Sequence, residues 1–197
     1  MKQKLSMSLN RGAAVVAVAL ASLVFAGCTT TAPKDQATAS QQRNDINTNA
    51  NTTLARLYKS TPDARGLVER AKGVLVFPTV LSAGFVIAAE HGNGVLRVNG
   101  RNQGYYSTSA GSIGLQAGAQ SKAIVLLFMT QEALDKFRNS NGWTVGADAT
   151  VAIANIGANG KIDTNTAKQS VVGFVLTNAG LMAGVSLEGA KIEKIKL

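Results

Sequence analysis

The stretch Lys122–Met129 constrains the fold most, because every residue after the lysine is apolar. The stretch reads KAIVLLFM, which is too short for a typical buried helix and is bounded by polar residues. A strand with one face in water alternates polar and apolar side chains, whereas a strand covered on both faces is apolar throughout. We therefore predict a strand that lies between two layers of a folded domain.

The apolar period changes at Gly73. Before it, Ile46, Ala50, Leu54, Leu57 and Tyr58 recur at helical spacing, and a second helical pattern follows Pro62. After it, short apolar runs alternate with turn signals such as HGNG (91–94). Residues 143–153 alternate as a strand, and Thr130 is placed to cap one short internal helix. The order predicts an α+β domain with N-terminal helices, one short internal helix, and an antiparallel sheet forming a sandwich or barrel.

The run GSIGLQAGAQ (111–120) is rich in glycine without matching a phosphate-binding loop. Its glycine spacing is not G-x-G-x-x-G, and a strand rather than a helix is expected after it. Ile113, Leu115, Ala117 and Ala119 alternate along one side. We predict a strand whose small residues allow a neighbouring element to approach closely.

The N-terminus has the features of a bacterial lipoprotein signal peptide. Lys2, Lys4 and Arg11 precede an apolar stretch (13–26) that is too short to span a bilayer. The stretch ends in FAGC, which resembles a lipobox with phenylalanine where leucine is usual, and Cys28 is the only cysteine. The resemblance implies cleavage after residue 27 and attachment of acyl chains such as palmitate to Cys28. A secretory signal followed by an incidental cysteine is the alternative.

The segment after Cys28 sets the expected domain boundaries. Residues 28–42 are rich in Thr, Ala, Gln and Ser, which predicts a disordered tether, and residues 43–197 form the folded domain. Lipoproteins retained in the inner membrane have aspartate directly after the acylated cysteine, whereas this chain has Thr29 there. The chain therefore resembles lipoproteins that are sorted onward, which implies an outer-membrane, lipid-anchored protein that faces the periplasm.

Four segments resemble the SYLF domain family. They are AKGVLVFP (71–78), AGFVIAAEHGNGVL (83–96), GYYSTSAGSIGLQAGAQ (104–120) and GWTVGADATVAI (142–153). The resemblance covers roughly residues 55–197. Eukaryotic members of this family are lipid-binding modules that recognise phosphoinositides, so the resemblance implies an anionic phospholipid headgroup as ligand.

The charge of the chain agrees with an anionic partner. The formal net charge is +9, and it falls to +6 when Lys2, Lys4 and Arg11 leave with the expected signal peptide. The basic residues of the two N-terminal helical segments are Arg56, Lys59, Arg65, Arg70 and Lys72. In the periplasm such a surplus favours lipid headgroups or cell-wall polymers rather than nucleic acid. The alternative is an envelope structural or adaptor protein that binds a protein partner or peptidoglycan, with AKIEKIK (190–196) as an edge strand.

Catalytic and metal-binding patterns are absent from the sequence. His91 is the single histidine and lies in an expected turn, so neither a Ser-His-Asp triad nor a Cys/His zinc site is expected. The segment that begins at Asp163 lacks the glycine and the glutamate of a calcium loop. Glu90 and Asp148 have no obvious acidic partner. We therefore expect a protein without a cofactor that is not an enzyme.

Overall fold

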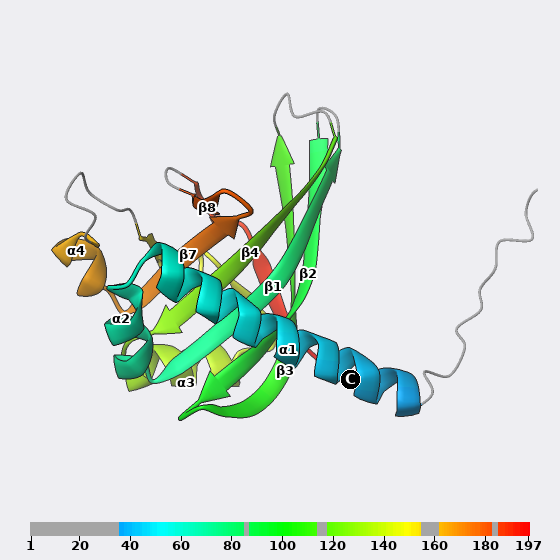
Figure 1. Cartoon of the computed structure of the whole chain (residues 1–197), viewed down its shortest axis with the longest axis horizontal. Coiled ribbons are helices and arrows are strands. Elements are labelled where there is room, and N and C mark those ends of the chain that lie inside the picture. The colour runs from blue at the N-terminus through cyan, green and yellow to red at the C-terminus, as the bar shows by residue number, and fades with distance from the viewer. Residues whose placement is uncertain (1–35, 85–86, 114–117, 155–161, 183–184) are drawn as a thin grey trace, which may run out of the picture. The chain divides into compact units, whose positions relative to one another are not determined.

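The computed structural model describes residues 36–84, 87–113, 118–154, 162–182 and 185–197 (Figure 1). The expected signal peptide, Cys28 and the first part of the expected tether lie outside these residues. Residues 35–197 form a compact unit that contains both hydrophobic cores described below. This unit therefore holds the burial it needs to fold on its own.

A single sheet organises the unit. Its strands are β1 (Gly73–Gly84), β2 (Ile87–Val98), β3 (Arg101–Ile113), β4 (Gly118–Phe128), β5 (Trp143–Thr144), β6 (Ala152–Ile153), β7 (Val171–Thr177), β8 (Gly180–Leu181) and β9 (Lys191–Ile195). They run in the order β5-β9-β3-β2-β1-β4-β7-β6, with β8 beside β7, and all named pairs except β6–β7 are antiparallel. The sheet curls into a half-barrel, so the predicted α+β class and antiparallel sheet are confirmed.

Helices cover both faces of the sheet. They are α1 (Gln36–Ser60), α2 (Ala64–Arg70), α3 (Gln131–Asn139) and α4 (Thr164–Ala167). Along β4, Ala123, Val125 and Leu127 join a core beneath α1 and α2, which we call the helix-side core. The intervening Ile124, Leu126 and Phe128 join the inner core with α3 and Trp143. All six side chains are buried, so the predicted doubly covered strand is confirmed.

The short helix α3 begins at the predicted cap. The Thr130 side chain accepts a hydrogen bond from the Ala133 amide at 3.2 Å. Leu134 and Phe137 on its buried side then enter the inner core. This satisfies one of the amides that a helix start leaves without a partner.

Replacing Thr130 with alanine tests this cap. We expect Thr130→Ala to lower the free energy of unfolding by about 1 kcal/mol, because the Ala133 amide loses its acceptor. Urea denaturation followed by fluorescence of the buried Trp143 measures it. Thr150→Ala, at an exposed position outside any helix, is the control that should change little. Equal effects of the two substitutions would contradict the capping role.

Helix α1 is longer than the sequence predicts. It begins at Gln36, so residues 36–42 are helical and are not part of a disordered tether. Ile46, Ala50 and Leu57 of the predicted stripe are buried on the sheet. Near its start, Arg43 donates hydrogen bonds to Ser40 Oγ and to the backbone oxygen of Leu197. These contacts stabilise the first part of α1, residues 36–42, whose polar composition alone would indicate disorder.

The predicted HGNG turn is wrong, because residues 91–94 lie inside β2. Opposite them β1 carries Pro78, and the pairing register of β1 shifts there on both sides. A Cβ on Gly92 would lie 2.5 Å from the Thr79 oxygen, so the glycine permits close packing against this bulge. The turn that joins β2 to β3 is Asn99–Gly100, whose φ angles are 50° and 73°.

Residues 143–153 do not form one strand, contrary to the prediction. Only β5 and β6 at the two ends pair with the sheet. Between them Gly146 has φ 89°, and the Asp148 carboxylate accepts a hydrogen bond from the Thr144 amide at 2.6 Å. This turn breaks the strand although the apolar alternation continues through it.

The glycine-rich run joins two strands. Gly111 to Ile113 end β3, and Gly118 to Gln120 begin β4, so the run is divided between two strands and is not the single strand predicted. A Cβ on Gly111 would meet no heavy atom within 4 Å, so the predicted close approach is not found there. Residues 114–117 lie outside the described residues. The two ends pair with different neighbours, since Ile113 lies opposite Ile87 and Gly118 lies opposite Gly84.

Candidate functional site

The five cations singled out in the sequence lie on and just after the two N-terminal helices. Arg56 and Lys59 belong to α1, Arg65 and Arg70 to α2, and Lys72 immediately precedes β1. The structure brings them together as two groups rather than one. The α1-end group consists of Arg56, Lys59 and Arg65, and its members line two hollows. The α2-end group includes Arg70 and Lys72, which line a third hollow.

The α1-end group surrounds Tyr58. The Arg65 guanidinium lies 4.4 Å from the centroid of the Tyr58 ring, and Arg56 Nη2 donates to the Thr177 oxygen at 2.7 Å. Lys59 is exposed and lines two hollows, one with Arg65 and one with Arg56 beside the β7–β8 turn. Burial raises the pKa of Tyr58, while the charge of Arg65 acts in the opposite direction. Stacking and hydrogen bonding thus fix the guanidinium groups of Arg65 and Arg56, and each lines a hollow with Lys59, which has no carboxylate partner within the described residues.

The α2-end group includes a cation that the sequence analysis missed. Lys168, next to α4, lines the same hollow as Arg70 and Lys72, together with Met129. The Lys72 amide donates to the Phe128 oxygen at 2.8 Å, which positions this segment at the end of β4. No spacing in the sequence connects Lys168 with Lys72, because α4 reaches this place only through the tertiary fold.

None of the five cations pairs with a carboxylate within the described residues. The ion pairs found there join Lys122 with Glu90 and Lys191 with Glu193. Lys59 and Arg70 also stand in the last turns of their helices, where a cation stabilises the helix dipole by about 0.3–1 kcal/mol. The cations therefore have a structural role and still carry charge that is free to attract an anion.

A polar network fastens α1 to the β2–β3 hairpin. Arg97 donates to Asn51 Oδ1 at 2.7 Å, to the Asn47 oxygen at 3.2 Å and to Asn102 Oδ1 at 3.3 Å. Asn47 in turn donates to the Tyr105 hydroxyl at 3.0 Å. Burial lowers the pKa of Arg97. These contacts occupy the nitrogens of Arg97, so its role is to hold the helix rather than to bind a ligand.

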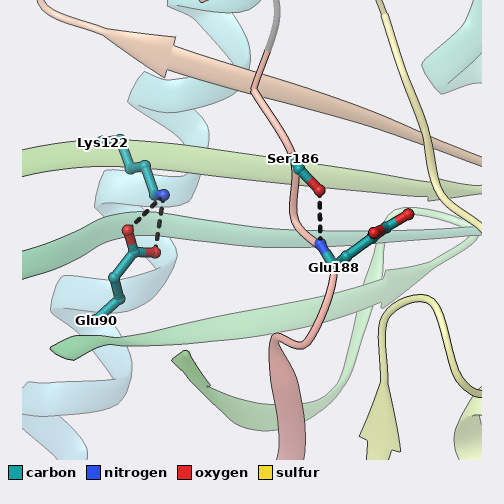
Figure 2. A network of polar contacts seen from close by, with 4 residues as sticks. All are labelled: Glu90, Lys122, Ser186 and Glu188. Atoms are coloured by element: carbon teal, nitrogen blue, oxygen red, sulfur yellow. Dashed lines mark hydrogen bonds and ion pairs between the residues drawn. The ribbon is translucent and has the colours of Figure 1, made fainter. Parts of the chain in front are cut away.

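A second polar cleft lies on the inner face of the sheet (Figure 2). Lys122 Nζ contacts both oxygens of Glu90, at 2.9 Å and 2.8 Å, across the intervening strand β1. Ser186 Oγ accepts from the Glu188 amide at 3.1 Å, which closes a turn beside the cleft. Glu90 thus has a basic partner that the sequence does not reveal.

The remaining candidate groups have structural partners. His91 lies in β2 rather than in a turn, and its Nδ1 is 3.2 Å from Ser109 Oγ. The Asp163 carboxylate caps α4 by accepting from the Asn165 and Thr166 amides. Within the part of the chain that the structure describes, no three His, Cys, Asp or Glu side chains come together to hold a metal ion. In the same part, no helix is long and apolar enough to cross a membrane.

Comparison with known proteins finds one family that part of this chain resembles. Residues 109–196 match the Ysc84 family, described as Las17-binding protein actin regulator. SH3 domain-containing YSC84-like protein 1 of Rattus norvegicus is 27% identical over 129 residues, which are 63% of this chain and 38% of the relative. Protein YSC84 of Saccharomyces cerevisiae is 29% identical over 133 residues, which are 64% of this chain and 28% of the relative.

A further yeast relative, LAS seventeen-binding protein 3, is 27% identical over 133 residues, which are 64% of this chain and 29% of the relative. This chain is thus similar to the Ysc84 (SYLF) family over its C-terminal half. The matched region spans less than two fifths of the length of these curated relatives.

Proposed function

We propose that this chain is a lipid-anchored envelope protein whose SYLF domain binds anionic phospholipid headgroups. The observation that carries the proposal is the set of cations at the ends of α1 and α2, which form no ion pair within the described residues. Glu69 also lines the α2-end hollow, where three cations outnumber it. Their arrangement around open hollows suits binding of a phosphate rather than catalysis. The binding groups are those of the sequence analysis together with Lys168.

Electrostatics makes this surface adequate for membrane binding. A basic residue close to an anionic bilayer contributes about 1 kcal/mol. Lys59, Arg65, Arg70 and Lys72 are exposed, whereas Arg56 already donates to a backbone oxygen, so its contribution is smaller. The groups lie on the same face of the sheet, which allows them to meet one membrane surface together.

The proposed anchor places the domain near the bilayer. Helix α1 begins at Gln36, only a few residues after Cys28. Even a fully extended chain of this length spans only roughly 30 Å. Acyl chains on Cys28 would therefore keep the folded unit near the periplasmic face of the outer membrane, where even weak headgroup contacts act at high effective concentration. The cations of α1 lie at the far end of this 25-residue helix, roughly 35 Å from Gln36.

Vesicle co-sedimentation of residues 35–197 tests the headgroup site. We expect replacement of Lys59, Arg65, Arg70 and Lys72 together by glutamine to weaken binding to phosphatidylglycerol-containing vesicles by tenfold or more. The matched control replaces four other exposed cations with glutamine, which are Lys136 and Arg138 on α3 and Lys194 and Lys196 in or just after β9. Equal losses in the two variants would mean that net charge, not this surface, drives binding.

A protein partner is the second candidate function. The family description and the yeast relative both name Las17 or LAS seventeen binding, which concerns those proteins. On this chain β9 offers a docking edge, because β5 pairs only with Lys191 and Ile192 among the described residues. Recovery of one envelope protein in equal amount with the domain, lost when Glu193 and Ile195 are replaced by proline, would favour this function. Unchanged vesicle binding by the same variant would show that the two activities are separate.

A further inference from the structure

The outer half of the β1–β2 hairpin has an apolar face that no other described residue covers. Leu81 and Ala83 on β1 and Ile87 and Ala89 on β2 are exposed, with Leu81 58% and Ile87 71% accessible. The register pairs Ala83 with Ala89, and alternation along each strand puts all four residues on one side. We call this set the distal face. It belongs to the same side of the sheet as Val95, which α1 covers further down.

The opposite side of the same strands is covered. Ser82, Ala88 and Thr108 are buried there, and Val80 belongs to the inner core. Figure 1 shows β1 to β4 continuing past α1, which crosses the lower half of the sheet. The helix-side core therefore ends where α1 ends its contact, and beyond it no described residue covers this side of the strands.

The hairpin region is also free of charge. Residues 73–89 and 102–121 contain no Asp, Glu, Lys, Arg or His. The first titratable groups beyond the distal face are Glu90 and His91 on β2 and Lys122 on β4. From Ile87 to His91 the strand extends roughly 13 Å. An uncharged apolar face of this length can lie along the acyl boundary, which interfacial elements enter to a depth of ~5–10 Å.

We propose that the distal face inserts into the boundary between headgroups and acyl chains, while the α1-end and α2-end groups hold the headgroups. This inference rests on the proposed function and adds an apolar contact to it. The distal face has only two large side chains, Leu81 and Ile87. The area that they expose is far smaller than the ~800 Å² per partner that a stable protein interface buries. Lipid needs no such complementary surface, and the cations on the same side of the sheet would bring the face to it.

Site-specific fluorescence tests the insertion. Residues 35–197 contain no cysteine, so Ile87→Cys carries a single environment-sensitive label such as a nitrobenzoxadiazole. We expect its emission to shift to the blue on phosphatidylglycerol vesicles and to be quenched by bromine-labelled acyl chains. The matched control is Ala147→Cys, exposed in the turn between β5 and β6, whose label should stay in water.

A charge substitution separates insertion from mere proximity. If the face inserts, Ile87→Lys should weaken vesicle binding about tenfold or more, because an ammonium enters the acyl boundary. If the face stays in water near an anionic surface, the same lysine strengthens binding. Met182→Lys, at an exposed apolar position outside the distal face, is the control. Thermal melting of each variant verifies folding.

The outcomes distinguish the two proposals. Insertion is overturned if the wild-type unit binds vesicles, the emission of the label at position 87 does not shift, and Ile87→Lys does not weaken binding. That result leaves headgroup binding intact. Absence of vesicle binding by the wild-type unit overturns both. A concentration-dependent dimer that Ile87→Lys abolishes, without any label shift on vesicles, would show that the face contacts a second copy and would also overturn insertion.

Discussion

Substituting Cys28 with serine should release the protein from the membrane. We expect Cys28→Ser to abolish incorporation of labelled palmitate and to prevent cleavage after residue 27, because the substitution removes the thiol that would carry the acyl chains. Each buried methylene contributes about 0.8 kcal/mol to membrane binding, so loss of the chains removes most of the attachment. Metabolic labelling and fractionation of the envelope measure both effects.

Thr29→Asp is the matched control for the anchor. It leaves the proposed acylated thiol in place, so labelling and processing should remain as in the wild type. Aspartate at this position should instead shift the protein toward the inner membrane. A wild-type protein that is cleaved elsewhere and recovered from the periplasm without acylation at Cys28 would contradict the anchor.

Replacing Gly94 with alanine should destabilise the domain by about 2–3 kcal/mol. A Cβ at this position would lie 2.4 Å from the Val76 backbone oxygen and 2.6 Å from Phe77 Cδ1. Phe77 is fully buried in the inner core and the Val76 oxygen belongs to the bulged central strand, so neither can move freely. Such overpacking costs typically 1–3 kcal/mol and occasionally more.

Gly111→Ala provides the comparison for Gly94. Gly111 also lies in a strand, yet a Cβ there would meet no heavy atom within 4 Å. We expect its midpoint in urea denaturation to stay near that of the wild type, while the Gly94→Ala midpoint falls. Similar midpoints for the two variants would contradict the close approach between β1 and β2 that the structure shows.

The sequence predicts elements well where the local pattern and the tertiary environment agree. The apolar run of β4 indicates burial on both faces, and both cores do cover it. The stripe of α1 and the Thr130 cap of α3 are local features with one structural meaning. In these places the residues that determine the element lie within a few positions of one another.

Prediction fails where a distant contact determines the local conformation. HGNG has the composition of a turn, but its glycines are needed by the bulge at Pro78 on the neighbouring strand. Asn99–Gly100 has the same chemistry and does form the turn. No local feature distinguishes the two, because the difference arises from strand pairing.

The same limit applies to the candidate site. Five cations cluster in the sequence and could be found there, while Lys168 joins them only through the position of α4. Arg56 is partly occupied by the Thr177 oxygen, which lies 121 residues further along the chain. The distal face could be predicted as strand, but its exposure depends on where α1 ends its contact with the sheet.

A headgroup-resolved binding profile of residues 35–197 tests the central claim most directly. Vesicles of phosphatidylcholine alone are compared with vesicles that also contain phosphatidylglycerol or cardiolipin, at low and high salt. We predict binding that requires the anionic lipid and weakens as salt screens the cations of α1 and α2. Equal binding to neutral and anionic vesicles, unaffected by salt, would contradict the claim.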